Sequence, residues 1–158
     1  MTTPIIWSIG YEHLSPGALE SIVRALGALL VDCRSVPWSR TPAFRQADLV
    51  HRFGERYCWR GLDLGGRRPG PKPAGLAWLQ DKAEAGRRVL LLCLEAAPGD
   101  CHRHRGIALR LLPVIDVAHI YGDEVILASE LERAILAGDD YTSTPLDDAL
   151  AGRWGDRP

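Results

Sequence analysis

One stretch, Arg88 to Leu112, constrains the fold more than any other part of the chain, because it joins an unbroken apolar run to a dense group of polar residues. The apolar run, residues 89–92, is typical of a strand buried on both faces of a parallel sheet. Alternation along that strand places Cys93 and Glu95 on the same face. A Pro-Gly turn and Asp100, a good N-cap, then predict a helix that begins near residue 101.

The first turn of that predicted helix carries a thiol, an imidazole and a guanidinium, from Cys101, His102 and Arg103. Unpaired backbone N–H groups and the helix dipole make such a turn electropositive. We therefore expect a lowered pKa and thiolate character for Cys101, with Glu95 or His102 as its acid or base. Cys93 is the second candidate nucleophile, and the alternative for both cysteines is a structural role in the core.

Apolar runs and helical stripes alternate along the chain, which is the pattern of an α/β domain. Runs at residues 5–9, 28–31 and 117–121 join the run at 89–92, and a weaker one covers 57–59. We expect a single three-layer α/β domain over residues 1–137, with a mostly parallel central sheet and helices on both faces. A capping box at Ser129 predicts its last helix. Residues 138–158 resemble a polar, acidic C-terminal tail, which Trp154 is expected to anchor.

Polar residues follow three of the predicted strands, and ligands of such sheets bind at the carboxyl ends of strands. We expect the substrate-binding residues to be Tyr11, His13, Asp32, Arg34, Arg40 and Arg103. The three arginines are expected to clamp a phosphate or carboxylate, because guanidinium groups match both anions. His119, within the predicted strand 117–121, is expected to be a hydrogen-bonded sheet histidine, and His51 an ordinary surface residue.

The net charge of −1 conceals an uneven distribution of charge along the chain. Residues 34–72 hold nine basic side chains and three acidic ones, whereas residues 123–158 hold nine acidic and three basic ones. A basic middle segment favours an anionic small molecule or a nucleic acid as partner, and a solvated surface is the alternative. No apolar run is long enough for a membrane span or a signal peptide, so we expect a cytoplasmic protein without a membrane partner. A homodimer is an assembly that the sequence leaves open.

Several short motifs in order resemble the DUF488 family over about residues 5–136. They are Ser8-Ile9-Gly10-Tyr11, Val31-Asp32-Cys33-Arg34-Ser35, Ser39-Arg40 with Pro42 and Phe44, Leu64-Gly65-Gly66, Cys93-Leu94-Glu95, Cys101-His102-Arg103 and His119-Ile120. The family pattern usually has valine where this chain has Cys33, a difference that concerns packing. The family name records an unknown function, so the resemblance implies an α/β fold and an active site at these motifs, and no substrate.

Together these observations favour a small enzyme that acts on an anionic, phosphate-bearing substrate, and nucleotides and nucleic acids are substrates of this class. The sequence does not indicate which reaction the enzyme catalyses. One alternative is a non-catalytic module that binds nucleic acid or a nucleotide. Another is a metal-dependent enzyme with Cys, His and Glu ligands, drawn from Cys93, Glu95, Cys101, His102 and His13. Their spacing matches no standard zinc pattern, so we assign no metal ligand and leave the cofactor unknown. The four cysteines form no C-x-x-C pair and are expected to be reduced thiols.

Overall fold

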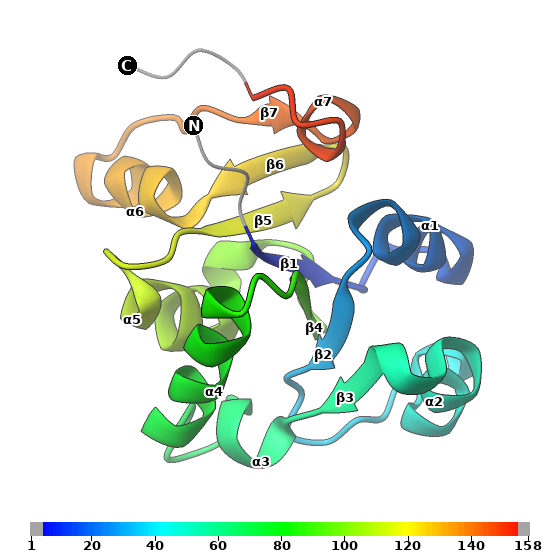
Figure 1. Ribbon diagram of the computed structural model, residues 1–158. Coiled ribbons are helices and arrows are strands. Elements are labelled where there is room, and N and C mark those ends of the chain that lie inside the picture. Colours follow the sequence, from blue (N-terminus) through cyan, green and yellow to red (C-terminus); the bar gives the residue numbers. More distant parts are fainter. Residues whose placement is uncertain (1–4, 155–158) are drawn as a thin grey trace.

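The structure is a computed structural model that describes residues 5–154, which form one α/β domain around a seven-stranded sheet (Figure 1). The order across the sheet is β3-β2-β4-β1-β5-β6-β7. The strands are β1 (Ile6–Gly10), β2 (Leu29–Asp32), β3 (Tyr57–Trp59), β4 (Val89–Cys93), β5 (Val117–Tyr121), β6 (Glu124–Leu127) and β7 (Thr144–Pro145). The prediction of a single α/β domain is confirmed for the described residues, as are the predicted strands that correspond to β1 to β5.

The sheet is mixed, and this corrects the prediction of a mostly parallel one. The strands from β3 to β5 in sheet order run parallel, whereas β6 is antiparallel to β5 and β7 is antiparallel to β6. Only Gly122 and Asp123 separate the paired residues Tyr121 and Glu124. A two-residue connection can only return the chain as a hairpin, and Gly122 supplies the positive φ of 63° that this turn requires.

The helices connect the strands and are mostly short. They are α1 (Pro16–Leu26), α2 (Gln46–Phe53), α3 (Gly61–Leu64), α4 (Pro73–Glu84), α5 (Leu109–Leu111), α6 (Ala128–Ala137) and α7 (Leu146–Leu150). Shorter 3-10 turns are η1 (Pro42–Phe44), η2 (Gly54–Arg56) and η3 (Pro98–Asp100), and η4 (Arg103–Ala108) is π-helical. The side chain of Ser15 caps α1 by accepting from the Ala18 N–H, and Gly27 ends the helix at a φ of 60°. No helix among residues 5–154 is long and apolar enough to cross a membrane.

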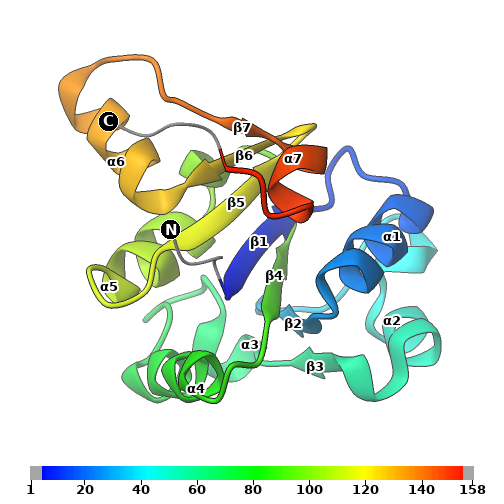
Figure 2. The same ribbon diagram turned by 45° about the horizontal axis from the view of Figure 1, so that its top comes forward.

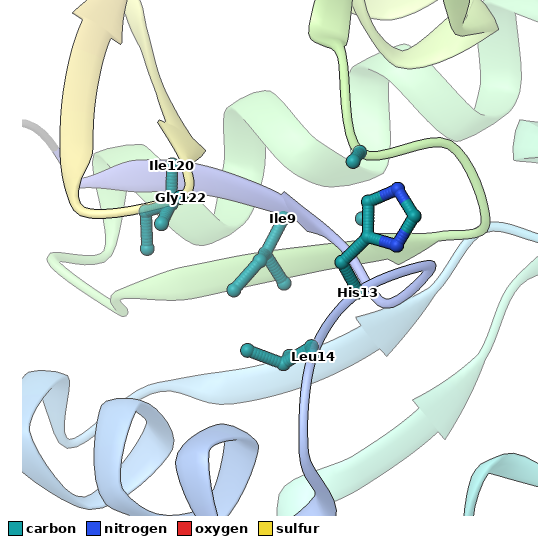
Figure 3. Close-up of a pocket in the computed structure, with 7 residues that line it drawn as sticks. Ile9, His13, Leu14, Ile120 and Gly122 are labelled. Carbon is teal, nitrogen blue, oxygen red and sulfur yellow. The ribbon is translucent and has the colours of Figure 1, made fainter.

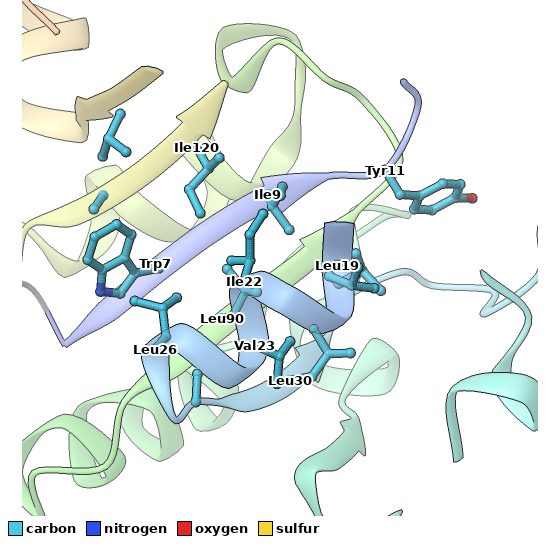
Figure 4. Packing of buried hydrophobic residues seen from close by; sticks show 14 of the residues in the cluster. Trp7, Ile9, Tyr11, Leu19, Ile22, Val23, Leu26, Leu30, Leu90 and Ile120 are labelled. Carbon is cyan, nitrogen blue, oxygen red and sulfur yellow. The ribbon is translucent and has the colours of Figure 1, made fainter. Parts of the chain in front are cut away.

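Two apolar clusters use the alternating side chains of the same strands. In the first cluster, residues of β1 and β4 such as Trp7, Ile9 and Leu90 pack against the stripe of α1 (Figure 4). The second cluster takes the intervening strand residues, such as Ile6 and Leu91, together with residues of α3, α4 and α6. Because both clusters draw on one set of strands, the sheet is buried on its two faces and its ligand-accessible groups are left at its ends.

Part of the segment predicted as a tail is folded. Its residues 144–150 form β7 and α7, and β7 pairs with β6 at the edge of the sheet (Figure 2). Trp154, the residue expected to anchor the tail, lies 5.6 Å from Trp7 between ring centroids. The last four residues of the predicted tail, 155–158, lie outside the described residues.

The chain after β4 departs from the single regular helix that the sequence predicts. Residues 98–100 form a 3-10 turn, residues 103–108 form the π-helical η4, and only residues 109–111 are α-helical. Asp100 therefore does not cap a helix, and η4 has no side-chain cap. The predicted capping box at Ser129 also fails, because α6 begins at Ala128 and Ser129 bonds Asp116 with both its N–H and its hydroxyl.

Candidate functional site

An open cleft of about 520 Å³ lies at the carboxyl ends of β1, β2 and β4. It is lined by Tyr11, Arg34, Ser35, Val36, Trp38, Gly66, Arg67, Cys93, Leu94, Glu95 and His102. Five of these residues, Tyr11, Arg34, Cys93, Glu95 and His102, are among the predicted site residues. The parallel register explains their convergence, because Gly10 at the end of β1 faces Cys93 at the end of β4.

The inner part of the cleft holds a cluster of two thiols, an imidazole and a carboxylate. The sulfur of Cys93 lies 3.5 Å from Oε2 of Glu95 and 3.6 Å from Nδ1 of His102. The sulfur of Cys101 lies 3.7 Å from the same Nδ1. Both thiols are nearly fully buried, but only Cys93 lines the cleft, so Cys93 is the thiol within reach of a bound molecule.

The imidazole of His102 is oriented by the backbone. Its Nε2 lies 3.1 Å from the carbonyl oxygen of Cys33, which can only accept a hydrogen bond, so Nε2 carries the hydrogen. In the neutral ring Nδ1 then presents its lone pair to the two sulfurs. Gly66 packs against the ring so closely that a Cβ there would lie 2.8 Å from its Cγ and Nδ1. A side chain at residue 66 would therefore displace the imidazole.

Protonation in this cluster is governed by burial and by mutual contact. The pKa of Cys101 is raised by its hydrogen bond with Cys93 and by burial. The pKa of Cys93 is raised as well: the hydrogen bond from Cys101 lowers it, but the hydrogen bond with Cys33 and burial outweigh that effect. Burial lowers the pKa of His102, and hydrogen bonds with the two sulfurs raise it to about 10. The pKa of Glu95 is lowered, because a backbone hydrogen bond and the two thiols outweigh burial, so it is a carboxylate at neutral pH.

The predicted low pKa of Cys101 is therefore wrong, for a physical reason. The sulfur of Cys101 faces Cys93 inside the protein, where a second anion would be unfavourable, and together with burial this outweighs the lowering effects of His102 and Arg103.

A buried ion pair forms the wall of the cleft next to β2. The guanidinium of Arg34 donates from Nε and Nη2 to the two carboxylate oxygens of Asp32, at 2.8 and 2.7 Å. Tyr57 donates its hydroxyl to the same carboxylate at 2.6 Å, and Arg34 stacks over the Tyr11 ring at 5.2 Å. Because Asp32 neutralises Arg34, this pair shapes the cleft and contributes little net charge to it.

The other two arginines of the predicted clamp do not line the cleft. Arg103 is fully buried and donates to the hydroxyl of Ser8 and to the carbonyl oxygens of Glu95 and Ala96, at 3.1, 2.6 and 3.0 Å. It therefore holds the loop that carries Glu95 instead of facing a ligand. Arg40 is exposed on the loop after β2, outside the lining of the cleft.

His13 lies at a different pocket, on the loop between β1 and α1 (Figure 3). This pocket has a volume of about 60 Å³ and is lined by Ile9, Gly10, His13, Leu14, Ala96, Ile120 and Gly122. It shares no lining residue with the cleft. The side chain of His13 is largely exposed and lies 3.6 Å from Glu12, so it does not join the thiol cluster as the sequence suggested.

Three polar or aromatic residues of the cleft lining were missing from the predicted set: Ser35, Trp38 and Arg67. Trp38 is 56 % exposed, with the guanidinium of Arg45 5.1 Å from its ring centroid. Arg67 is exposed on the glycine-rich loop, and its backbone N–H donates to the Ser35 hydroxyl at 3.1 Å. Trp38 could have been found from the sequence, because a large aromatic residue beside prolines and arginines, in a segment without periodicity, is unusual for a core residue.

A second polar group, contributed by β1, β5, η4 and α6, lies outside the lining of the cleft. His119 contacts the Ser8 hydroxyl through Nδ1 and His104 through Nε2, the latter at 3.0 Å. His104 in turn lies 3.1 Å from the Glu132 carboxylate. Both ring nitrogens of His119 are thus bonded, which confirms the prediction of a hydrogen-bonded sheet histidine.

The direction of these hydrogen bonds is fixed by their ends. The Glu132 carboxylate can only accept, so Nε2 of His104 donates to it. Nδ1 of His104 must then accept the hydrogen bond that Nε2 of His119 donates. Nδ1 of His119 in turn accepts from the Ser8 hydroxyl. Arg103 donates to Ser8 at the other end. Burial lowers the pKa of both histidines, most strongly that of His119, so the rings are neutral. We name Ser8, His119, His104 and Glu132 the buried chain. It extends from the Arg103 guanidinium to the Glu132 carboxylate, and each of its hydrogen bonds has a defined donor and acceptor.

No family model, curated protein or solved structure matches this chain.

Proposed function

We propose that this protein is an enzyme that binds an anionic, phosphate-bearing substrate in the cleft, with Cys93 as the reacting thiol and His102 as the group that exchanges its proton. The observation that carries the proposal is the convergence of Cys93, His102 and Glu95 at the inner end of one accessible cleft. A thiol within reach of an oriented imidazole is the arrangement used in nucleophilic catalysis by cysteine. The volume of about 520 Å³ suits a molecule of nucleotide size.

Arg67 is the residue assigned to the anion. It is exposed at the mouth of the cleft, whereas the guanidinium of Arg34 is already paired with Asp32. Several other arginines of the basic segment also have partners within the protein: Arg45 stacks on Trp38, Arg52 pairs with Glu20 and Arg60 pairs with Asp63. This internal pairing reduces the charge left for a polynucleotide backbone and favours a small anion over a nucleic acid.

Trp38 extends the proposal to the rest of the substrate. Its exposed indole lies at the rim of the cleft, and the guanidinium of Arg45 is held over the same ring. An exposed aromatic face stacks with nucleobases. A nucleotide with its phosphate at Arg67 and its base at Trp38 is therefore the substrate class that the lining favours.

The test is a thermal-shift titration with pyrophosphate and with nucleoside monophosphates. Each should raise the melting temperature as it saturates the cleft. Arg67→Ala should weaken binding by about tenfold, the effect of losing one charged hydrogen bond, while Arg68→Ala, an exposed neighbour outside the cleft, should not. Trp38→Ala should weaken the nucleotide and spare pyrophosphate. Equal effects of the two arginine variants, or no shift with any of these anions, would overturn the proposal.

A further inference from the structure

We propose that two thiols, an imidazole and a carboxylate at the inner end of the cleft form a binding site for a soft divalent metal ion of the zinc class. The ligands are Cys93, Cys101, His102 and Glu95. The Sγ atoms of Cys93 and Cys101 and a carboxylate oxygen of Glu95 all lie within 4.8 Å of one another. Nδ1 of His102 lies within 3.7 Å of both sulfurs.

Three of the separations match the edges of a zinc tetrahedron. With metal–sulfur bonds of about 2.3 Å and metal–nitrogen or metal–oxygen bonds of about 2.0 to 2.2 Å, the edges between unlike ligands are about 3.5 to 3.6 Å. The distances from Cys93 Sγ to Glu95 Oε2 and to His102 Nδ1 are 3.5 and 3.6 Å, and that from Cys101 Sγ to Nδ1 is 3.7 Å. Cys93, Cys101 and His102 are thus spaced for an ion, and Glu95 lies on the Cys93 side of the set, where its carboxylate can complete it.

The second observation is the support behind the imidazole. Metal-bound histidines usually donate their other ring N–H to a carbonyl or carboxylate, which fixes the ring and its tautomer. Nε2 of His102 makes this bond to the Cys33 carbonyl oxygen, at 3.1 Å, and leaves Nδ1 toward the sulfurs. The third nearby thiol, Cys33, is fully buried and donates to the Leu92 carbonyl oxygen at 3.2 Å, so it is assigned to the support and not to the ligand set.

The donor set selects the class of ion. Thiolate and imidazole ligands suit zinc and related soft ions, whereas calcium and magnesium take oxygen ligands. Each thiol that binds the ion releases its proton to solvent, so no oxidant or reductant is involved. The inference goes beyond the proposed function and is independent of it, and it adds a regulatory consequence: a bound ion occupies the Cys93 sulfur and prevents its reaction.

Cobalt(II) is the probe, because tetrahedral thiolate sites give it a sulfur-to-metal charge-transfer band that other ligands do not. The full chain, reduced with a phosphine and freed of metal by a chelator, is titrated with cobalt and then with zinc. We expect one cobalt ion per chain with that band, displaced by one zinc ion. Absence of the band would overturn the inference.

Variants identify the ligands. Cys101→Ser should lower cobalt affinity at least about 100-fold, because losing a ligand exceeds the usual cost of losing a supporting hydrogen bond. The matched control is Cys58→Ser, a half-buried cysteine of β3 outside the cluster. His102→Ala, at a residue that is only partly buried, repeats the test if Cys101→Ser does not fold. An unchanged band in either folded variant would refute the ligand assignment.

The same samples separate this inference from the proposed function. Metal-free protein that responds to pyrophosphate but gives no charge-transfer band refutes the metal site alone. Protein that binds cobalt but shows no thermal shift with any anion refutes the proposed function alone. Zinc should also suppress iodoacetamide labelling of Cys93 while Cys58 continues to react, and continued labelling of Cys93 at saturating zinc would contradict its role as a ligand.

Discussion

The thiol cluster and the buried chain are built from similar groups, yet they differ in how their hydrogen bonds are satisfied. In the buried chain each histidine nitrogen has one partner, and charged residues terminate both ends. In the thiol cluster one nitrogen, Nδ1 of His102, faces two sulfurs, and the groups meet solvent at the cleft. A satisfied network stabilises a unique core, whereas a network with spare donors and acceptors can take a ligand or change its protonation. His119 and His104 therefore belong to the satisfied core, whereas His102 is the histidine whose contacts a ligand of the cleft can change.

The thiol cluster and the buried chain meet at the loop that carries Glu95. We expect the largest loss of stability from a substitution that displaces this loop. A Cβ at Gly10 would lie 1.7 Å from the carbonyl oxygen of Glu95, the same oxygen that accepts from Arg103. Gly10→Ala should therefore push the loop away and destabilise the fold by about 3 kcal/mol or more. Urea unfolding measures the loss. Gly17→Ala, where a Cβ meets nothing within 4 Å, is the control, and a Gly10→Ala protein of wild-type stability would contradict this close packing.

The next largest loss of stability is expected from a substitution in the buried chain that leaves the thiol cluster intact. His119→Leu leaves the Ser8 hydroxyl and the His104 ring without their partner in the core, which should cost about 2 kcal/mol of unfolding free energy. His51→Leu, at an exposed position of α2, should cost much less. Anion binding by the folded His119→Leu protein should stay close to that of the wild type. If its anion affinity collapsed while stability was unchanged, the division of roles between the two regions would be wrong.

A smaller loss of unfolding free energy is expected when the pH is lowered. Burial, the Arg103 charge and His104 keep the pKa of His119 well below 6.5, and burial also lowers that of His104. Below pH 6.5 the unfolded rings bind protons while the folded rings do not, so the free energy of unfolding should fall as the pH falls through that value. Urea unfolding between about pH 8 and pH 5.5 tests this. Relative to His119→Leu, the wild type should lose stability toward acid, and an equal pH dependence of the two proteins would contradict the neutral buried chain.

The sequence predicted the elements that local pattern determines. The apolar run at residues 89–92 marks β4 correctly, and β–α alternation led to the carboxyl ends of the strands as the place for Tyr11, Arg34 and Cys93. It missed β6 and β7, because a two-residue turn and short strands carry little periodicity.

Long-range contacts account for the errors at the site. Nothing local in the sequence indicates that Arg103 is fully buried among carbonyl oxygens, since arginine is rarely buried without an acidic partner. The raised pKa of Cys101 depends on contact with Cys93 and on an irregular turn at residues 98–108. Both features arise from tertiary packing, which periodicity and spacing do not report.

The most direct test of the central claim, that the cleft is a binding site with Cys93 at its inner end, is peptide-resolved labelling with iodoacetamide. The metal-free, reduced protein is labelled for a limited time with and without pyrophosphate, and all four cysteines are quantified in each sample. We predict that Cys93, which lines the cleft, reacts faster than Cys33 and Cys101, which do not, and that pyrophosphate protects Cys93 while labelling of Cys58 is unchanged. Labelling of Cys93 no faster than that of Cys33, or equal labelling with and without the anion, would contradict the account.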